Sequence, residues 1–352
     1  HSSPCHMSNP ALPINFNNTE KAFAYKTDRD LKRARFLFTV MQFAPLVKLG
    51  TQITPWAIKS GLPVKGIIKN TLFKQFVGGE SLEETVGVAD MLEKFNVQVI
   101  LDYGVEGGEG DEDKYEAEAS YFIKVIQFAA TRKNIPFISI KITGLVSSSL
   151  LEKLDTSLST NGVEPLHTRF NSKFQQLSQE EKAQWEQLMA RTVRLCQAAS
   201  DAGIGIMIDA EESWIQDAID VVATQMMAAF NLGKVVVYNT VQLYRSDRLS
   251  YLSNTLEEAE QAGYLAGLKL VRGAYMEKER ARAMELGYPS PIQPSKESTD
   301  RDYDTAIGIC MTKIELVSII VASHNEKSNL LAANESGSKH LPAMHPHLHF
   351  SQ

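Results

Sequence analysis

The stretch "LKLVRGAYMEKERARA", residues 268–283, changes character in its middle. It begins as a short apolar run, which is typical of a buried strand, and it ends in the pattern of a charged helix. Two cations, a glycine, an alanine and a tyrosine stand at the changeover: Lys269, Arg272, Gly273, Ala274 and Tyr275. A buried lysine is costly unless it is paired or functional. The stretch therefore predicts a strand that carries polar groups to its carboxyl end, followed by a helix with a solvated face.

The same strand pattern recurs along most of the chain. Apolar runs rich in β-branched residues predict strands at 97–103, 137–143, 204–210, 234–244, 265–271, 317–323 and 347–352. Amphipathic stretches separate these runs, among them 115–133, 178–203 and 249–264. Alternating strands and helices imply a parallel sheet with helices outside it. Seven strands, with no Gly-rich dinucleotide fingerprint after the first, favour an α/β fold of the (βα)8 barrel type over a doubly wound sheet.

These patterns divide the chain into three segments. Residues 1–7, "HSSPCHM", resemble the remnant of an expression tag, with Met7 as the natural start. Residues 8–95 form a helical region that is interrupted by prolines, and Ser81 with Glu84 predicts a capping box there. Residues 96–352 form the barrel, incomplete after strand seven. An eight-stranded barrel needs a further strand and a closing helix, which we expect beyond Gln352.

Bulk composition excludes some classes of protein. The chain has 352 residues and a formal net charge of -6, which disfavours a nucleic-acid-binding surface. Its 3 cysteines show neither a paired nor a metal-binding spacing, which indicates a reducing compartment. No apolar run is long enough to span a bilayer, and no secretory signal opens the chain. We therefore expect a cytoplasmic protein, with the mitochondrial matrix as the alternative.

Polar side chains stand at nearly every predicted strand end. They are Asp102, Lys141, Asp209 to Glu212, Gln242, Tyr244, Lys269, Arg272, Tyr275, Ser323, His324 and Asn325. For a single residue, contact with solvent at a strand end is explanation enough. As a set they favour an active site, because barrel enzymes place their sites at this end of the strands. Asp102 and Asp209 are candidate partners for the two lysines on this rim.

This set of residues suits an anionic cofactor. Cations beside a glycine favour a phosphate, and Gly273 would let a ligand approach the backbone. Gln242 could hydrogen-bond the edge of a heteroaromatic ring. The segment 295–303 predicts a helix start that Ser295, Ser298 or Thr299 caps, with Lys296 within reach of a phosphate.

Other sites fit the sequence less well. A metal site at His340, His345, His347 and His349 lacks a nearby acidic ligand, so we predict no metal. The glycine-rich segment 104–120 is acidic, which indicates a solvated loop rather than a phosphate loop. An aldolase-like barrel with a Schiff-base lysine, and a structural or binding module without catalysis, remain alternatives.

Seven motifs in order resemble one known family. They are "DYGVEG", "SIKITGL", "IDAEESW", "NTVQLY", "LKLVRGAYMEKERARA", "PIQPSKESTDRDYD" and "ASHNEKS". From about residue 70 onward the chain resembles the FAD-dependent proline dehydrogenases, which also occur as one domain of bifunctional proline utilisation proteins. The resemblance implies a distorted (βα)8 barrel that binds FAD non-covalently. It also implies oxidation of L-proline to Δ1-pyrroline-5-carboxylate, the first step of proline catabolism, with hydride passing from proline C5 to flavin N5.

The resemblance also implies roles for individual residues. Asp209 and Lys269 are the expected catalytic residues, with Asp209 orienting Lys141. Lys141 and Tyr275 are the expected substrate-binding residues, and Asp102 joins them from its place at the first strand end. The expected FAD-binding residues are Ala210, Gln242, Arg272, Gly273, Ala274, Lys296, Thr299, Ser323 and His324.

Further expectations concern partners and the end of the chain. The resemblance implies electron transfer to a membrane quinone, peripheral association with the inner membrane, and association with pyrroline-5-carboxylate dehydrogenase. The family binds the proline carboxylate with an arginine pair on its last helix and a nearby tyrosine, both expected beyond Gln352. Without them the chain is expected to bind proline poorly and FAD weakly. A catalytically impaired barrel fragment and a hydroxyproline-preferring paralogue are therefore the alternatives.

Overall fold

The structure is a computed structural model in two compact units, residues 1–97 and 98–352. It describes residues 14–43, 45, 48, 53, 59–60, 66, 71, 73–104, 110–156, 164–342 and 344–352. The tag remnant at residues 1–7, including Met7, lies outside the described residues, as does most of the acidic glycine-rich segment before residue 110.

The first unit is helical in its described part. Its helices are α1 (Thr19–Ala22), α2 (Asp28–Met41), α5 (Lys74–Phe76) and α6 (Leu82–Glu93). The Ser81 side chain caps α6 by accepting from the Glu84 N–H. The Glu84 carboxylate in turn accepts from the Glu80 N–H at 2.9 Å. The predicted serine cap is thus present, and the glutamate bonds one residue before the cap.

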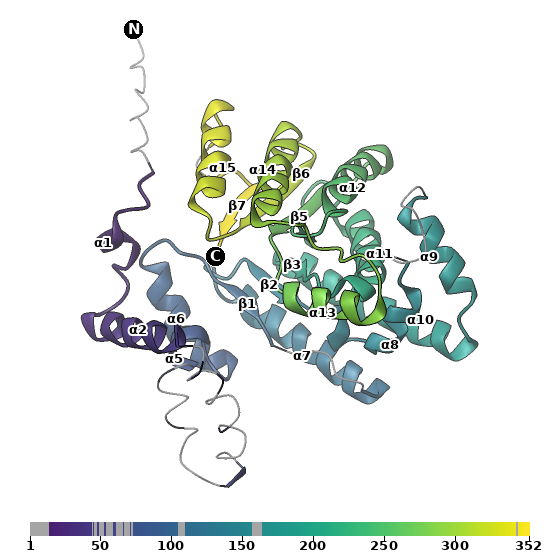
Figure 1. Ribbon diagram of the computed structural model, residues 1–352, viewed down its shortest axis with the longest axis horizontal. Coiled ribbons are helices and arrows are strands. Elements are labelled where there is room, and N and C mark those ends of the chain that lie inside the picture. Colours follow the sequence, from purple (N-terminus) through teal and green to yellow (C-terminus); the bar gives the residue numbers. More distant parts are fainter. Residues whose placement is uncertain are drawn as a thin grey trace. The chain divides into compact units, whose positions relative to one another are not determined.

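The second unit is built on a seven-stranded parallel sheet (Figure 1). Its strands are β1 (Ile100–Asp102), β2 (Phe137–Ile140), β3 (Gly205–Ile208), β4 (Val237–Gln242), β5 (Ala266–Val271), β6 (Val317–Ala322) and β7 (Leu348–Ser351). Each strand pairs in parallel with the next one in the sequence. A doubly wound sheet would reverse its strand order, so this singly wound order confirms the barrel-type prediction.

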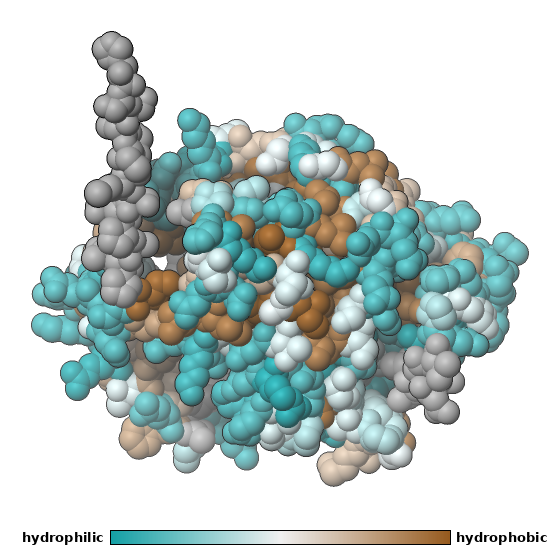
Figure 2. Space-filling model, turned by 90° about the horizontal axis from the view of Figure 1, so that it is seen from above, coloured by the Kyte–Doolittle hydropathy of each residue, from teal (hydrophilic) through white to brown (hydrophobic). Residues whose placement is uncertain are grey.

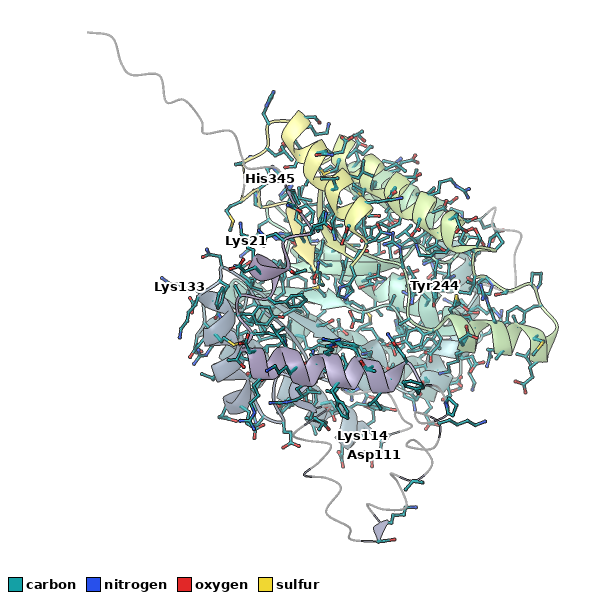
Figure 3. The ribbon with its side chains drawn as sticks, turned by 60° about the vertical axis from the view of Figure 1, so that its left-hand side comes forward. Lys21, Asp111, Lys114, Lys133, Tyr244 and His345 are labelled. Carbon is teal, nitrogen blue, oxygen red and sulfur yellow. The ribbon has the colours of Figure 1, made fainter. Side chains whose placement is uncertain are left out.

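Helices follow the strands and cover the outside of the sheet (Figure 1). They are α7 (Glu112–Ala130), α8 (Ser148–Leu154), α9 (Leu166–Gln175), α10 (Gln179–Ala202), α11 (Ser213–Phe230), α12 (Arg248–Ala262), α13 (Met276–Leu286), α14 (Lys296–Thr312) and α15 (Glu326–Ser338). Asp111 caps α7 by accepting from the Lys114 N–H at 3.0 Å (Figure 3). Ser178 and Glu181 form a capping box at the start of α10. All three predicted amphipathic helices are therefore present.

Burial explains why the strands read as continuous apolar runs. Every residue of β3 and β4 is buried, because helices cover one side of the sheet and side chains fill the other. Met207, Tyr238 and Ile320 form one cluster of this interior. Lys269 interrupts the pattern on β5, where it pairs in register with Thr240 of β4. A polar residue in so apolar a strand calls for a partner.

Surface composition is mixed in the space-filling view. Figure 2 shows hydrophilic side chains over much of the visible face, with hydrophobic patches between them. Among the described residues, no helix is both long enough and apolar enough to cross a membrane.

Gly267 on β5 has no room for a side chain. A Cβ atom there would lie 2.2 Å from the Val237 carbonyl oxygen, which is backbone and cannot rotate away. We expect Gly267→Ala to lower the free energy of unfolding by about 3 kcal/mol, measured by chemical denaturation. Gly308→Ala is the control, because nothing lies within 4 Å of its added Cβ in α14. That variant should be neutral or gain up to about 1 kcal/mol, and equal losses in both would contradict the prediction.

Candidate active site

One pocket of about 640 Å³ opens at the carboxyl ends of β2 to β6. It is lined by Lys141, Asp209, Ala210, Thr240, Gln242, Lys269, Val271, Arg272, Gly273, Ala274, Tyr275, Lys296, Ala322, Ser323, His324 and Asn325. The structure thus gathers all but two of the residues to which the family resemblance or the substrate-binding prediction gives a role. The order of the strands explains this, because parallel neighbours present their carboxyl ends on the same rim.

Asp102 and Thr299 are the two predicted residues that do not line the pocket. Asp102 ends β1 and is exposed. Thr299 is buried in the first turn of α14, where its hydroxyl lies 3.4 Å from the Ser295 carbonyl oxygen. Ser295 caps this helix by accepting from the Ser298 N–H. Thr299 therefore lies behind the pocket wall, in the helix whose first residue, Lys296, lines it.

Asp209 and Lys269 form an ion pair inside the pocket. Both side chains are 15% exposed, so water screens the pair only weakly. The strand-end pattern predicts Asp209 as a candidate partner for either lysine of the rim, and the expected catalytic role has it orient Lys141. The structure shows it bonded to Lys269. The Asp209 N–H donates to the Ile140 carbonyl oxygen at 2.9 Å, which fixes the aspartate just beyond β3.

Lys141 stands directly after β2 rather than within it. The strand ends at Ile140, and the chain then enters a 3-10 turn, η2 (Ile142–Gly144), with Lys141 as its N-cap residue. Among the described residues, the Lys141 ammonium has no ion-pair or hydrogen-bond partner. It is therefore a cation of the pocket that is left for a ligand.

Gln242 presents an unused acceptor to the pocket. Its Nε2 donates to the Glu211 carbonyl oxygen at 3.1 Å, which settles the orientation of the amide. Its Oε1 is buried and has no hydrogen-bond partner among the described residues. Because a buried acceptor without a partner is costly, this atom indicates a site for an N–H or O–H donor of a ligand.

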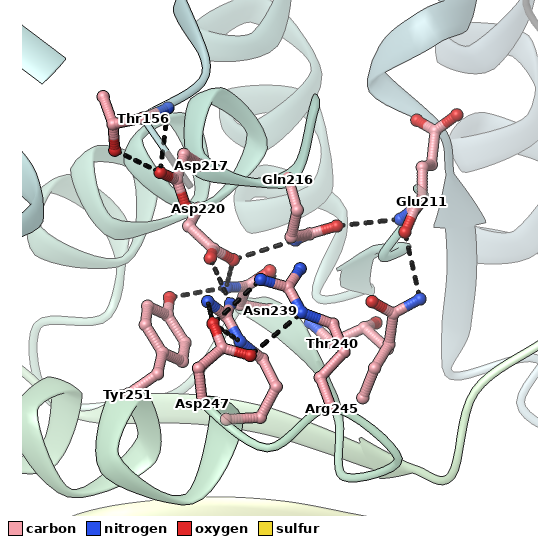
Figure 4. A network of polar contacts seen from close by, with 12 residues as sticks. Thr156, Glu211, Gln216, Asp217, Asp220, Asn239, Thr240, Arg245, Asp247 and Tyr251 are labelled. Carbon is pink, nitrogen blue, oxygen red and sulfur yellow. Dashed lines mark hydrogen bonds and ion pairs between the residues drawn. The ribbon is translucent and has the colours of Figure 1, made fainter. Parts of the chain in front are cut away.

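A buried polar network supports Gln242 from behind (Figure 4). The Glu211 N–H donates to Gln216 Oε1 at 2.8 Å, and Gln216 Nε2 donates to Asp220 Oδ1 at 2.9 Å. Asp220 is completely buried and also accepts from Asn239 and from Arg248, the latter at 2.6 Å. No sequence pattern pointed to this network, because its members come from three different elements.

The same network continues into a cluster of charges after β4 (Figure 4). Asp247 receives hydrogen bonds from both Arg245 and Arg248. Burial alone would raise the pKa of Asp247, but the two arginines outweigh it and hold that pKa well below its usual range. The cluster therefore stays ionised at neutral pH.

Arg272 joins four elements through one guanidinium group. Its Nε donates to Asp300 of α14 at 2.8 Å, and its two other nitrogens donate to Ser323 after β6 and Ser328 of α15 at 2.6 and 3.0 Å. It also lies over the Tyr303 ring, 4.3 Å from the ring centre. The fork geometry of arginine suits this role, and part of the group still faces the pocket.

Gly273 is required by the protein itself. It has a φ of 138°, and a Cβ atom there would lie 2.4 Å from the ring of Tyr244. Tyr244, which Figure 3 labels, is buried, and its N–H donates to the Arg272 carbonyl oxygen at 2.8 Å. The sequence predicts that Gly273 lets a ligand approach the backbone, and Gly273 does line the pocket; the tyrosine ring lies on the side where its Cβ would be.

Two glutamates are buried, which the sequence did not predict: Glu211, placed only among the polar strand ends, and Glu279, placed on a solvated face. Glu211 accepts from the Thr143 N–H at 3.2 Å and from its hydroxyl at 2.5 Å. Glu279 of α13 accepts from the Ser213 N–H at 2.7 Å and from its hydroxyl at 2.6 Å. The predicted solvated face of α13 is therefore wrong at Glu279, which is completely buried. For Glu211 the available signal was the presence of three acids in "DAEE", and for Glu279 the sequence offered none.

The histidines near the end of the chain make local contacts. His347 Nδ1 lies 2.7 Å from the Ile314 carbonyl oxygen, and His349 Nε2 lies 3.1 Å from that of Pro346. Within the described residues, no group of three histidine, cysteine or acidic side chains is placed to hold a metal ion.

Comparison with known families decides the family of this chain. The sequence model described as proline dehydrogenase matches residues 86–352. The chain belongs to the proline dehydrogenase family. The matched region contains every strand of the sheet and every residue that lines the pocket.

Proteins of similar sequence carry names that agree with membership of this family. Proline dehydrogenase 1, mitochondrial, of Dictyostelium discoideum is 29% identical over 315 residues, covering 82% of this chain and 55% of that protein. Hydroxyproline dehydrogenase of Xenopus laevis is 30% identical over 339 residues, covering 88% of this chain and 71% of that protein. The chain thus spans about half the length of the Dictyostelium relative.

A solved structure of the same fold is proline utilisation A from Bdellovibrio bacteriovorus inactivated by N-propargylglycine. It superposes with a TM-score of 0.63 at 18% identity, covering 81% of this chain and 29% of that one. At this identity the similarity supports the fold of this proline dehydrogenase family member.

The strength of the Asp209–Lys269 pair can be measured with a double-mutant cycle. We expect Asp209→Asn and Lys269→Met to show a coupling energy of about 1–3 kcal/mol in chemical denaturation, because the pair is largely buried. The control cycle uses the neighbouring pair of Glu212 and Lys278, whose lysine is 60% exposed. Its coupling should stay below about 1 kcal/mol. Equal coupling in both cycles would show that burial does not strengthen the pocket pair.

Proposed function

We propose that this protein is an FAD-dependent proline dehydrogenase, which oxidises L-proline to Δ1-pyrroline-5-carboxylate. The observation that carries the proposal is the pocket of a chain of the proline dehydrogenase family: four cations line it together with Gln242, whose Oε1 has no hydrogen-bond partner among the described residues. Because this chain spans only part of its Dictyostelium relative, the activity is proposed for the full-length protein.

The residues of the pocket fit FAD. Four cations line it, namely Lys141, Lys269, Arg272 and Lys296, against one lining carboxylate, Asp209. An excess of positive charge suits a pyrophosphate. Gln242 Oε1 needs a donor, and the edge of a flavin ring carries an N–H group. FAD, when bound, supplies the two-electron acceptor for hydride from the carbon next to the proline nitrogen.

The chain's own groups divide into two sides. Lys269 would stabilise negative charge on the ring, with Asp209 fixing the direction of its ammonium. Arg272 and Lys296 would hold the phosphate and adenosine side, and Ala210, Gly273, Ala274, Ser323 and His324 would line the cofactor. Lys141 and Tyr275 would contact the substrate. Asp102, on the substrate side, and Thr299, on the cofactor side, do not line the pocket and would contribute only indirectly.

Partners and location are proposed on the same basis. Several relatives are named mitochondrial proline dehydrogenases, which favours the mitochondrial matrix over the cytoplasm. We propose a membrane quinone as the electron acceptor, with peripheral contact to the inner membrane. Association with pyrroline-5-carboxylate dehydrogenase is proposed because the solved structural neighbours are proline utilisation A proteins.

A hydroxyproline substrate is the second candidate. The observation in its favour is the relative from Xenopus laevis, which is named hydroxyproline dehydrogenase and matches 88% of this chain. Both substrates share the ring nitrogen, the adjacent carbon and the carboxylate, so they differ only in what contacts the ring hydroxyl.

The test is the visible spectrum of the full-length protein saturated with FAD. Flavin absorbance should fall when L-proline is added without oxygen, and faster than with 4-hydroxyproline. Lys269→Met should slow this reduction by roughly 100-fold, because about 2.7 kcal/mol of electrostatic stabilisation is lost. Lys278→Met is the control, since Lys278 pairs with Glu212 and does not line the pocket.

Three results would contradict the proposal. A protein that binds no flavin excludes this cofactor, and faster bleaching by 4-hydroxyproline supports the second candidate. Borohydride-dependent covalent labelling of Lys141 by a carbonyl compound, without flavin absorbance, would indicate a Schiff-base enzyme instead.

A further inference from the structure

Glu211 is a buried carboxylic acid directly behind the wall of the pocket. It is 4% exposed and does not itself line the pocket, although its neighbour Ala210 does. Its backbone is fixed on both sides, since its N–H donates to Gln216 and its carbonyl oxygen accepts from Gln242. Nothing in the proposed reaction uses its side chain.

Both carboxylate oxygens of Glu211 accept hydrogen bonds from one residue, Thr143. Oε1 accepts from the Thr143 N–H at 3.2 Å, and Oε2 accepts from the Thr143 hydroxyl at 2.5 Å. Thr143 is the middle residue of the 3-10 turn η2, and Lys141 is the N-cap of that turn. Glu211 therefore fixes the short segment of backbone from which the Lys141 side chain enters the pocket.

The other charges near Glu211 are already paired. Asp209, two residues earlier, bonds Lys269 of β5, and Glu212 bonds Lys278 of α13. Gln216 of α11 and Gln242 of β4 pack here without charge. Lys141 is thus the nearby cation that has no carboxylate partner among the described residues, and it attracts the charged form of Glu211.

We propose that Glu211 is a positioning residue for Lys141, which holds the turn that presents the ammonium to the pocket and sets how strongly that ammonium attracts an anionic ligand. The inference rests on the proposed function in one respect: the ligand is taken to be the carboxylate of a five-membered ring. It needs no turnover, because it concerns binding of that carboxylate.

The charge of Glu211 changes within the physiological range. The pKa of Glu211 is raised to about 7: burial, and to a smaller extent the charge of Glu212, raise it, while hydrogen bonds from Thr143 and the charge of Lys141 lower it. Below pH 7 the group is neutral, and Lys141 acts on the ligand alone. Above pH 7 the Glu211 carboxylate repels an anionic ligand, and it also attracts the Lys141 ammonium that the ligand needs. Binding should therefore weaken as the pH rises through about 7.

The probe is cyclopentanecarboxylate, which has the ring and carboxylate of proline without the nitrogen to be oxidised. Its dissociation constant is measured by titration calorimetry on the full-length, FAD-saturated protein between pH 6 and pH 8.5. The wild-type constant is compared with that of Glu211→Gln, which mimics the neutral acid. We expect equal values at pH 6 and about threefold to tenfold tighter binding by the variant at pH 8.5.

The ratio of the two constants isolates Glu211. His324 also lines the pocket, and it is present in wild type and variant alike, so its contribution to binding cancels in the ratio. Glu279→Gln is the matched control, because Glu279 is another buried glutamate that accepts from the N–H and hydroxyl of one residue. It does not line the pocket, and its ratio to wild type should not change with pH.

A second variant covers the case in which Glu211→Gln fails to fold. Thr143→Val keeps the shape of the turn and removes the hydroxyl that donates to Glu211. Because that hydrogen bond lowers the pKa of Glu211, its loss should move the weakening of binding to higher pH.

Each outcome decides the inference. A ratio for Glu211→Gln that stays constant from pH 6 to pH 8.5, or a wild type that does not bind the probe at pH 6, overturns it. An unshifted profile for Thr143→Val also overturns it. Normal probe binding in a protein that fails to oxidise proline contradicts the proposed function and leaves this inference supported.

Discussion

The pairing of every strand with its sequence neighbour, always in parallel, is the constraint on which the rest of this structure depends. It forces the carboxyl ends of β2 to β6 onto one rim, whatever residues happen to stand there. The register then decides depth: Lys269 lies beside Thr240 inside the sheet, while Arg272 lies beyond the last paired residue. One ladder of backbone hydrogen bonds thereby places one cation of "LKLVRGAY" within the sheet and the other just beyond its paired residues.

Cations gathered on one rim repel one another, and carboxylates at different depths of the pocket reduce this repulsion. Asp209 neutralises Lys269 within the pocket, and Asp300 lies between Arg272 and Lys296 at its edge. Lys141 alone of the four lining cations has no such contact among the described residues. Positive charge is therefore offered to a ligand at one point and balanced by the protein at the others.

Sequence reasoning succeeded where a local pattern determines the outcome. The seven strands follow from short apolar runs, and most of the pocket follows from the polar residues that end them. It failed where the outcome depends on which side chain meets which across the sheet. Which of the two lysines pairs with Asp209, and the burial of Glu279, both depend on contacts between elements distant in sequence. Asp102 has the same sequence signature as Asp209, yet β1 leaves it exposed.

The hydrogen bonds of Arg272 to Asp300, Ser323 and Ser328 have a consequence for folding during synthesis. Its partners come from α14, from the end of β6 and from α15, so the last of them, Ser328, is synthesised well after the arginine itself. Until that serine has left the ribosome, the Arg272 nitrogen that donates to it lacks this partner. This part of the rim is thus complete only after α14, β6 and the start of α15 have all been synthesised.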